Sequence, residues 1–152
     1  MSDYQVAIGL EVHIELQTKT KAFCSCRNEE TALPNTAVCP VCLGLPGAVP
    51  SINKVAVEKT IAAAILLEAE ISKVTYFERK NYFYPDLPKG YQIVQFNSPI
   101  ACNGKLKLSS GKVINIDRVH LEENAGKLIH NSEDNCTYID FNRHINIKSK
   151  LS

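Results

Sequence analysis

Apolar and polar positions alternate regularly along the first segment of the chain, residues 5–17. Every even position holds a branched apolar side chain, and every odd position holds a polar or small one. Because successive residues of a strand point to opposite faces, this pattern predicts a strand with one buried face. The other face would carry Glu11, His13 and Glu15 in a row, and a solvated strand face is the plainest interpretation of these three residues.

A single helix is predicted after a proline-rich connector. Residues 54–67 are rich in helix formers, and either Ser51 or Asn53 can cap the N-terminus through its side chain. The helix should end by about Ala69. Its apolar residues suit packing on a core, so no chemistry is assigned to it.

The remaining regular segments are short strands and turns. Two strands are predicted, at residues 71–77 and 91–96. Two tight turns are predicted, at Asn103-Gly104 and at Ser109-Ser-Gly111. The turns would make residues 105–108 and 112–122 antiparallel neighbours. The 152 residues are therefore expected to form one domain of the α+β class, mainly an antiparallel sheet with one packed helix.

Composition and charge narrow the possible functions. The chain holds 17 Lys and Arg residues against 16 Asp and Glu residues, so its overall field does not attract nucleic acid, and any RNA contact must be local. The longest apolar run, residues 61–67, is far shorter than the roughly 20 residues that cross a bilayer. With no secretory leader at the N-terminus, we expect a cytoplasmic protein with no membrane contact.

Four of the six cysteines form two close pairs separated by twelve residues: Cys24, Cys26, Cys39 and Cys42. Pairs of thiolates on turns can bind one tetrahedral ion, so the sequence predicts a zinc loop at residues 20–47. The first pair has the less common C-x-C spacing. Disulfides and unmetallated thiols are the alternatives, whereas Cys102 and Cys136 are expected to be packed or free thiols.

A second group of ionisable residues lies on the strand predicted at 112–122. Arg118, His120 and Glu122 share one face of it, and Glu123 begins the next turn. This group could face Glu11, His13 and Glu15 in one sheet, and carboxylates with an imidazole suit Mg²⁺ or Mn²⁺ bridging nucleotide phosphates. The sequence has no Walker A, G-x-G-x-x-G or G-x-S-x-G motif, so nucleotide chemistry would need another scaffold.

Basic, aromatic and proline residues are concentrated in residues 79–92. Prolines keep such a segment extended, so its side chains can be presented at low entropic cost. Arg79, Lys80 and Lys89 could contact phosphates. The aromatic side chains could stack on a base or, equally well, cover the core: Tyr82, Phe83, Tyr84 and Tyr91.

Taken together, these motifs resemble consecutive blocks of the GatB family, the B component of glutamyl/aspartyl-tRNA amidotransferases. The four blocks are Gly9-Leu-Glu-Val-His13, Val38-Cys-Pro-Val-Cys-Leu-Gly-Leu-Pro-Gly47, residues 79–92, and Val119-His-Leu-Glu-Glu-Asn-Ala-Gly-Lys-Leu-Ile-His130. Their order also matches. The resemblance covers about residues 4–143.

The resemblance implies a heterotrimeric ligase with an amidase-type A subunit and a small C subunit. Glutamine supplies ammonia, ATP phosphorylates the side-chain carboxylate of a mischarged Glu-tRNA(Gln) or Asp-tRNA(Asn), and ammonia displaces the phosphate. It implies that four residues act in catalysis and hold Mg²⁺: Glu11, His13, Glu122 and Glu123. It implies that four more hold ATP or the acceptor end: Arg79, Lys80, Tyr82 and Lys89.

Two departures from the family pattern affect this interpretation. Asn124 stands where the family has Asp, and residues 144–152 do not follow the family. We therefore expect an N-terminal part of the catalytic domain, without the family's helical and tRNA-binding tail domains and inactive alone. The competing hypotheses are a non-catalytic zinc-ribbon module that binds RNA or protein, which leaves the carboxylates unexplained, and an inert remnant.

Overall fold

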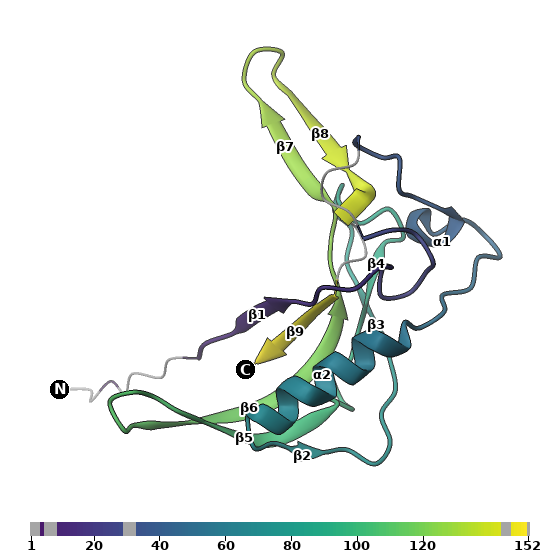
Figure 1. The fold of residues 1–152 in the computed structure, drawn as a ribbon. Helices are drawn as coiled ribbons and strands as arrows, with labels where there is room; N and C mark the ends of the chain where they lie inside the picture. The colour runs from purple at the N-terminus through teal and green to yellow at the C-terminus, as the bar shows by residue number, and fades with distance from the viewer. Residues whose placement is uncertain (1–3, 5–8, 29–32, 144–146, 152) are drawn as a thin grey trace.

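A five-stranded antiparallel sheet forms the body of the molecule in the computed structural model (Figure 1). The structure describes residue 4 and residues 9–28, 33–143 and 147–151. In spatial order the strands are β1 (Val12–Glu15), β9 (Ile147–Leu151), β6 (Val113–Glu123), β5 (Ala101–Lys107) and β2 (Glu70–Ile71). Every pairing is antiparallel, which confirms the predicted α+β class with a mainly antiparallel sheet.

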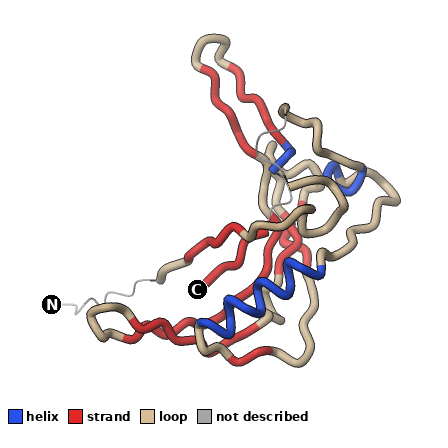
Figure 2. The backbone as a smooth tube through the Cα atoms, viewed as in Figure 1, coloured by secondary structure: helices blue, strands red, loops and turns tan. Residues whose placement is uncertain are grey.

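Two hairpins extend this body. The first pairs β3 (Glu78–Asn81) with β4 (Tyr91–Val94), and β4 packs against β6. The second pairs β7 (Lys127–Asn131) with β8 (Cys136–Asp140) and projects away from the sheet, as Figure 2 shows. The short 3₁₀ helix η1 (Phe141–Arg143) follows β8 and brings the chain back toward the body.

The described ranges contain two α-helices, and the longer one lies along the sheet. Helix α1 (Pro40–Leu43) is one turn inside the cysteine loop, and α2 (Lys54–Leu66) packs against β2, β5 and β6. Asn53 caps α2 by accepting a 3.0 Å hydrogen bond from the Val55 N–H, which satisfies one free donor of the first turn. The buried side of α2 consists of small residues that let the helix approach the sheet closely: Ala56, Thr60 and Ala64.

The first of the two predicted turns is wrong. Strand β5 continues through Asn103-Gly104, with Cys102 opposite Arg118 and Gly104 opposite Ile116 in one register, although Asn103 itself has a left-handed backbone conformation at φ 57°. The glycine serves packing instead, because a Cβ at Gly104 would lie 3.1 Å from the Leu67 carbonyl oxygen behind α2. The second turn is confirmed by the 2.8 Å bond from the Leu108 N–H to the Lys112 carbonyl, which closes the β5–β6 hairpin.

The strand predicted at residues 5–17 is shorter and more exposed than expected. Residues 5–8 lie outside the described part of the chain, and β1 begins only at Val12. The predicted burial of one face fails along β1, since Val12 is 50% and Ile14 37% exposed, and holds only just after it at Leu16, which is 8% exposed. Strand β1 is the edge of the sheet and pairs with β9 alone, so only one of its edges is covered within the described residues.

The strand predicted at residues 71–77 is also largely wrong, because β2 ends at Ile71. Beyond it, the Ser72 hydroxyl donates to the Pro99 carbonyl at 2.8 Å and the Thr75 hydroxyl donates to the Ser98 carbonyl. These side-chain bonds replace a strand ladder. The start of the extended segment predicted at residues 79–92 belongs to a strand, since residues 78–81 form β3.

Candidate functional site

The four predicted cysteines converge on one point. The Sγ atom of Cys42 lies 3.6 Å from that of Cys24, 3.7 Å from that of Cys39 and 3.9 Å from that of Cys26, and all four sulfurs lie within 4.8 Å of one another. Four thiolates bound tetrahedrally to Zn²⁺ at about 2.3 Å would have sulfurs about 3.8 Å apart. The cluster can therefore hold a metal ion, and its spacing is compatible with zinc.

Local chain geometry brings the two cysteine pairs together. Cys39 stands immediately before α1, Pro40 supplies the fixed first helical position, and Gly44 ends the turn in the left-handed region at φ 65°. This turn buries Cys42. The first pair lies on a tight loop closed by a 3.0 Å bond from the Lys21 N–H to the Cys26 carbonyl, and this loop accommodates the short C-x-C spacing.

The six cysteines are free thiols, so the disulfide alternative does not describe this fold. Within the cluster, the hydrogen bond from the Cys24 thiol lowers the pKa of Cys42 to about 4, and the nearby Lys21 ammonium adds to this effect. The same bond raises the pKa of Cys24, and burial raises the pKa of Cys26 to about 11. Cys42 is the most buried of the four residues, and the Lys21 ammonium lies 3.6 Å from its sulfur.

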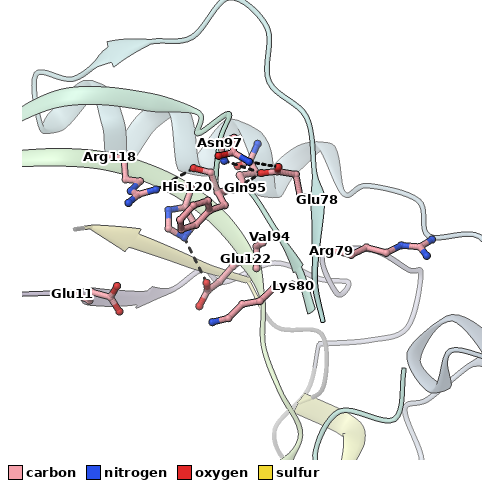
Figure 3. Close-up of a pocket in the computed structure, with 11 residues that line it drawn as sticks. Glu11, Glu78, Arg79, Lys80, Val94, Gln95, Asn97, Arg118, His120 and Glu122 are labelled. Carbon is pink, nitrogen blue, oxygen red and sulfur yellow. Dashed lines mark hydrogen bonds and ion pairs between the residues drawn. The ribbon is translucent and has the colours of Figure 1, made fainter. Parts of the chain in front are cut away.

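A second site is a hollow of about 360 Å³ between β6 and the β3–β4 hairpin (Figure 3). Its ionisable wall combines carboxylates, cations and an imidazole: Glu11, Glu78, Arg79, Lys80, Arg118, His120 and Glu122. Charges of both signs around one hollow suit a ligand that carries phosphate and binds with a cation.

His120 and Glu122 are the buried polar part of this hollow. The His120 Nε2 atom lies 3.6 Å from Glu122 Oε2, and both side chains are about nine-tenths buried. His120 Nδ1 is buried without a hydrogen-bond partner among the described residues. Glu11, the residue immediately before β1, lines the same hollow and is drawn in Figure 3.

Glu78 is fixed at the opposite side of the hollow. It accepts hydrogen bonds from the Asn97 N–H at 2.8 Å, from Asn97 Nδ2 at 2.6 Å and from the Phe96 N–H at 3.0 Å. These bonds, chiefly those from Asn97, hold the pKa of Glu78 below its usual value. Arg118 donates to the Phe96 carbonyl at 3.0 Å and stacks over the Phe96 ring at 5.0 Å, so the wall is ordered before any ligand binds.

The structure brings together only part of the predicted Mg²⁺ cluster. Glu11 and Glu122 reach the hollow, whereas His13 is exposed on β1 and does not line it. Glu123 lies on the opposite face from Glu122, because β6 continues to Glu123 and neighbouring strand residues alternate. Within the described ranges, the four cysteines are the only set of three or more ligating side chains whose atoms converge.

Glu123 is part of a buried ion pair with Lys89, and the side chains are 0% and 1% exposed. Its other carboxylate oxygen accepts the Ile93 N–H at 2.9 Å, and Gln92 donates to its carbonyl. Burial raises the pKa of Glu123, and the Lys89 ammonium opposes that shift. The pair fastens the β3–β4 hairpin to β6, and Lys89 is not presented to the hollow.

Only some of the residues predicted to contact the nucleotide border the hollow. Arg79 and Lys80 both border the hollow from β3, but only Lys80 extends toward Glu122. The Arg79 guanidinium points away from the hollow, as Figure 3 shows, and stacks on Tyr91 at 4.6 Å. Tyr82 is half-buried beside Lys80 and does not line the hollow, and burial raises the pKa of its hydroxyl. No sequence pattern indicates Glu78 or Asn97, whereas Arg118 and His120 share the strand face of Glu122 and could be found from it.

Among the described residues, no helix combines the length and apolar character needed to span a bilayer.

Comparison with known proteins defines the class first. The model of the GatB/GatE catalytic domain matches residues 6–146, so the chain belongs to this family, as its motifs predicted. It is 53% identical over 145 residues to the B subunit of the aspartyl/glutamyl-tRNA(Asn/Gln) amidotransferase of Clostridium novyi (strain NT), a match that covers 93% of this chain and 30% of that protein.

Two further relatives bear the same name. That of Helicobacter pylori (strain HPAG1) is 51% identical over 146 residues, with 94% of this chain and 30% of the relative covered. That of Borrelia recurrentis (strain A1) is 54% identical over 145 residues, with 93% and 30% covered. The chain spans about 30% of the length of these curated relatives.

Proposed function

We propose that this chain supplies the carboxylate-activating site of the B component of a tRNA-dependent amidotransferase in the cytoplasm. The substrates are mischarged Glu-tRNA(Gln) or Asp-tRNA(Asn), ATP and ammonia, with glutamine as the amide donor through an amidase-type A subunit, and a small C subunit completes the complex. The observation that carries the proposal is the hollow in which the carboxylates of Glu11 and Glu122 line the same wall as the Lys80 ammonium.

The proposed reaction requires two negatively charged groups, the side-chain carboxylate of the aminoacyl-tRNA and the γ-phosphate of ATP, to approach each other. A carboxylate oxygen of the aminoacyl side chain attacks the γ-phosphorus of ATP and ADP leaves; ammonia then attacks the acyl carbon and phosphate leaves. The Lys80 ammonium lies at the hollow, where it can offset phosphate charge, and Arg118 lines the same hollow; preorganised cations of this kind are a main source of catalysis in phosphoryl transfer.

Carboxylates at the same hollow fit a hard divalent cation. Glu11 and Glu122 offer oxygen donors, and His120 lies beside Glu122. Mg²⁺ held there would neutralise phosphate oxygens as the two anions approach. We keep His13 as a candidate ligand from the family resemblance, but the geometry favours Glu11 and Glu122 over Glu123, whose carboxylate is already paired with Lys89.

Zinc bound by the four cysteines would form a structural site and not a catalytic one. All four sulfurs would be ligands, so no position remains for a catalytic water. Phe23, inside the cysteine loop, packs edge-to-face on Phe77 with ring centroids 5.2 Å apart, immediately before β3. A rigid loop would therefore support the strand that carries Arg79 and Lys80.

Nucleotide binding by the 152-residue chain tests this proposal. Calorimetric titration with ATP should show binding that strengthens with Mg²⁺, and Glu122→Gln should remove the Mg²⁺-dependent part. Glu58→Gln on the exposed side of α2 is the matched control and should bind as the unsubstituted chain does. Equal Mg²⁺ dependence in Glu122→Gln and the control would contradict the assignment of the site.

The alternative, a non-catalytic zinc-ribbon module that binds RNA or protein, is favoured by the cysteine cluster alone. It assigns no role to the mixed-charge hollow. Zinc-dependent RNA binding together with a complete lack of Mg²⁺-dependent ATP binding would favour this alternative.

A further inference from the structure

Lys21 has an unusual position for a lysine, because its side chain is fully buried. It stands at the entrance of the cysteine loop, and its Nζ atom donates to the Ala37 carbonyl at 2.7 Å and the Phe141 carbonyl at 3.1 Å. Its third contact is the Cys42 sulfur at 3.6 Å. Among the described residues no carboxylate pairs with Lys21.

A buried ammonium group is costly unless a negative charge lies nearby. Two carbonyl oxygens satisfy hydrogen bonds of the ammonium but carry no net charge. The Cys42 sulfur belongs to a group that, as four thiolates around one divalent ion, would hold a net charge of two minus. The ammonium is therefore placed where a loaded cluster supplies the missing countercharge.

The Phe141 contact links this charge to a distant part of the chain. Phe141 lies in η1, and the same junction is fastened to the cysteine loop by Asn35, which donates to the Ile139 carbonyl at 2.8 Å and accepts the Phe141 N–H at 2.8 Å. Asn142 accepts the Ala37 N–H at 2.8 Å. The next strand along the chain after η1 is β9, which pairs with β6. In this pairing Glu122 of β6 stands opposite residue 148 of β9.

We propose that Lys21 is the charge partner of the metal-loaded cysteine cluster and couples metal binding to the order of the η1 junction, residues 139–142. Lys21 is a positioning residue in this role, since it would not bind the metal itself. The inference rests on the proposed metal site but not on the proposed reaction. It predicts that metal loading stabilises a turn that leads into the sheet carrying the second site.

Substitution of Lys21 by methionine removes the charge and keeps most of the aliphatic length. Zinc affinity, measured by competition with a chromophoric chelator, should fall about 10- to 100-fold in Lys21→Met, the usual range for partners of metal ligands. Lys19→Met, an exposed position in the same segment, is the matched control and should retain the affinity of the unsubstituted chain.

Thermal unfolding separates a charge partner from a merely structural lysine. If Lys21 only satisfies two carbonyls, its loss lowers the unfolding temperature equally with and without zinc. If it balances the loaded cluster, the rise in unfolding temperature on adding zinc shrinks in Lys21→Met, while the metal-free protein changes less. Equal loss in both states, or zinc affinity equal to that of Lys19→Met, overturns the inference.

Hydrogen exchange on the unsubstituted chain keeps the test independent of any folding failure in the variant. Zinc should slow amide exchange at Phe141, Asn142 and the end of β8, and chelation should reverse this effect. Unchanged exchange there on zinc removal overturns the inference. A chain that binds no zinc at all refutes the proposed metal site itself and the coupling with it, whereas zinc binding without protection of the junction refutes the coupling alone.

Discussion

The buried pair of Lys89 and Glu123 gives the most demanding test of the packing between the β3–β4 hairpin and β6. Lys89→Met leaves the Glu123 carboxylate fully buried with one remaining donor, the Ile93 N–H. Removal of one partner from a buried ion pair costs about 3–5 kcal/mol, because the remaining charge has lost its solvent and its counterion. A domain of this size has a free energy of unfolding of about 5–15 kcal/mol, so the loss is large.

Urea unfolding at neutral pH would measure this cost. The double variant Lys89→Met with Glu123→Gln should lose less than Lys89→Met alone, because no unpaired charge remains and the amide oxygen can still accept the Ile93 N–H. Lys54→Met is the control: it breaks an exposed 3.5 Å pair with Glu58 and should cost only about 0.3–0.5 kcal/mol.

The pH dependence of Lys89→Met has a defined sign. Burial raises the pKa of Glu123, and loss of the opposing ammonium raises it further. Since the folded-state pKa then exceeds the unfolded value, the variant is most stable below the unfolded pKa and loses stability as pH rises through the folded pKa. Its deficit against the unsubstituted chain should therefore shrink at acid pH. A cost below about 1 kcal/mol at neutral pH, or a deficit that grows on acidification, would refute the reasoning.

Three other predictions follow from the two sites. Asn97→Ala should raise the pKa of Glu78 toward its ordinary 4.5, which NMR titration would measure. In the unsubstituted chain the Asn97 bonds hold this pKa below the unfolded value, so they stabilise the fold above pH 4.5, and their contribution is lost as pH falls through the folded pKa. Cys42→Ser should abolish binding of about one zinc per chain by elemental analysis, whereas Cys136→Ser should not. The 152-residue chain alone, given mischarged tRNA, ATP and ammonia, should form no amide product, because misplacement of reactants by about 1 Å can cost 100-fold; turnover near that of a full-length relative would contradict this.

Features that depend on short spacings could be predicted from the sequence. The cysteine pairs, the cap at Asn53 and the turn before Lys112 each involve residues close along the chain, where local geometry decides the outcome. The ionisable face of β6 also follows from strand alternation. The family resemblance rests on ordered blocks of such local motifs, and the match over residues 6–146 confirms it.

Features that depend on distant neighbours could not be predicted in this way. Asn103-Gly104 has the composition of a turn, and the glycine inside β5 is explained by close packing against Ile116 of β6 and the residues that follow α2. Glu123 turns away from Glu122 because β6 runs one residue beyond the predicted end of the strand, which places its side chain beside Lys89. Glu78 and Asn97 meet only after the chain folds back between β3 and β4.

The most direct test of the central claim is phosphate transfer to the aminoacyl carboxylate. In a complete amidotransferase that contains this sequence, ADP formation that depends on mischarged tRNA would be measured for Glu122→Gln and Glu58→Gln, with glutamine hydrolysis followed in parallel. The proposed site predicts that Glu122→Gln loses tRNA-dependent ADP formation by about 100-fold or more, while glutamine hydrolysis and the Glu58→Gln control are retained. Undiminished ADP formation in Glu122→Gln would contradict it.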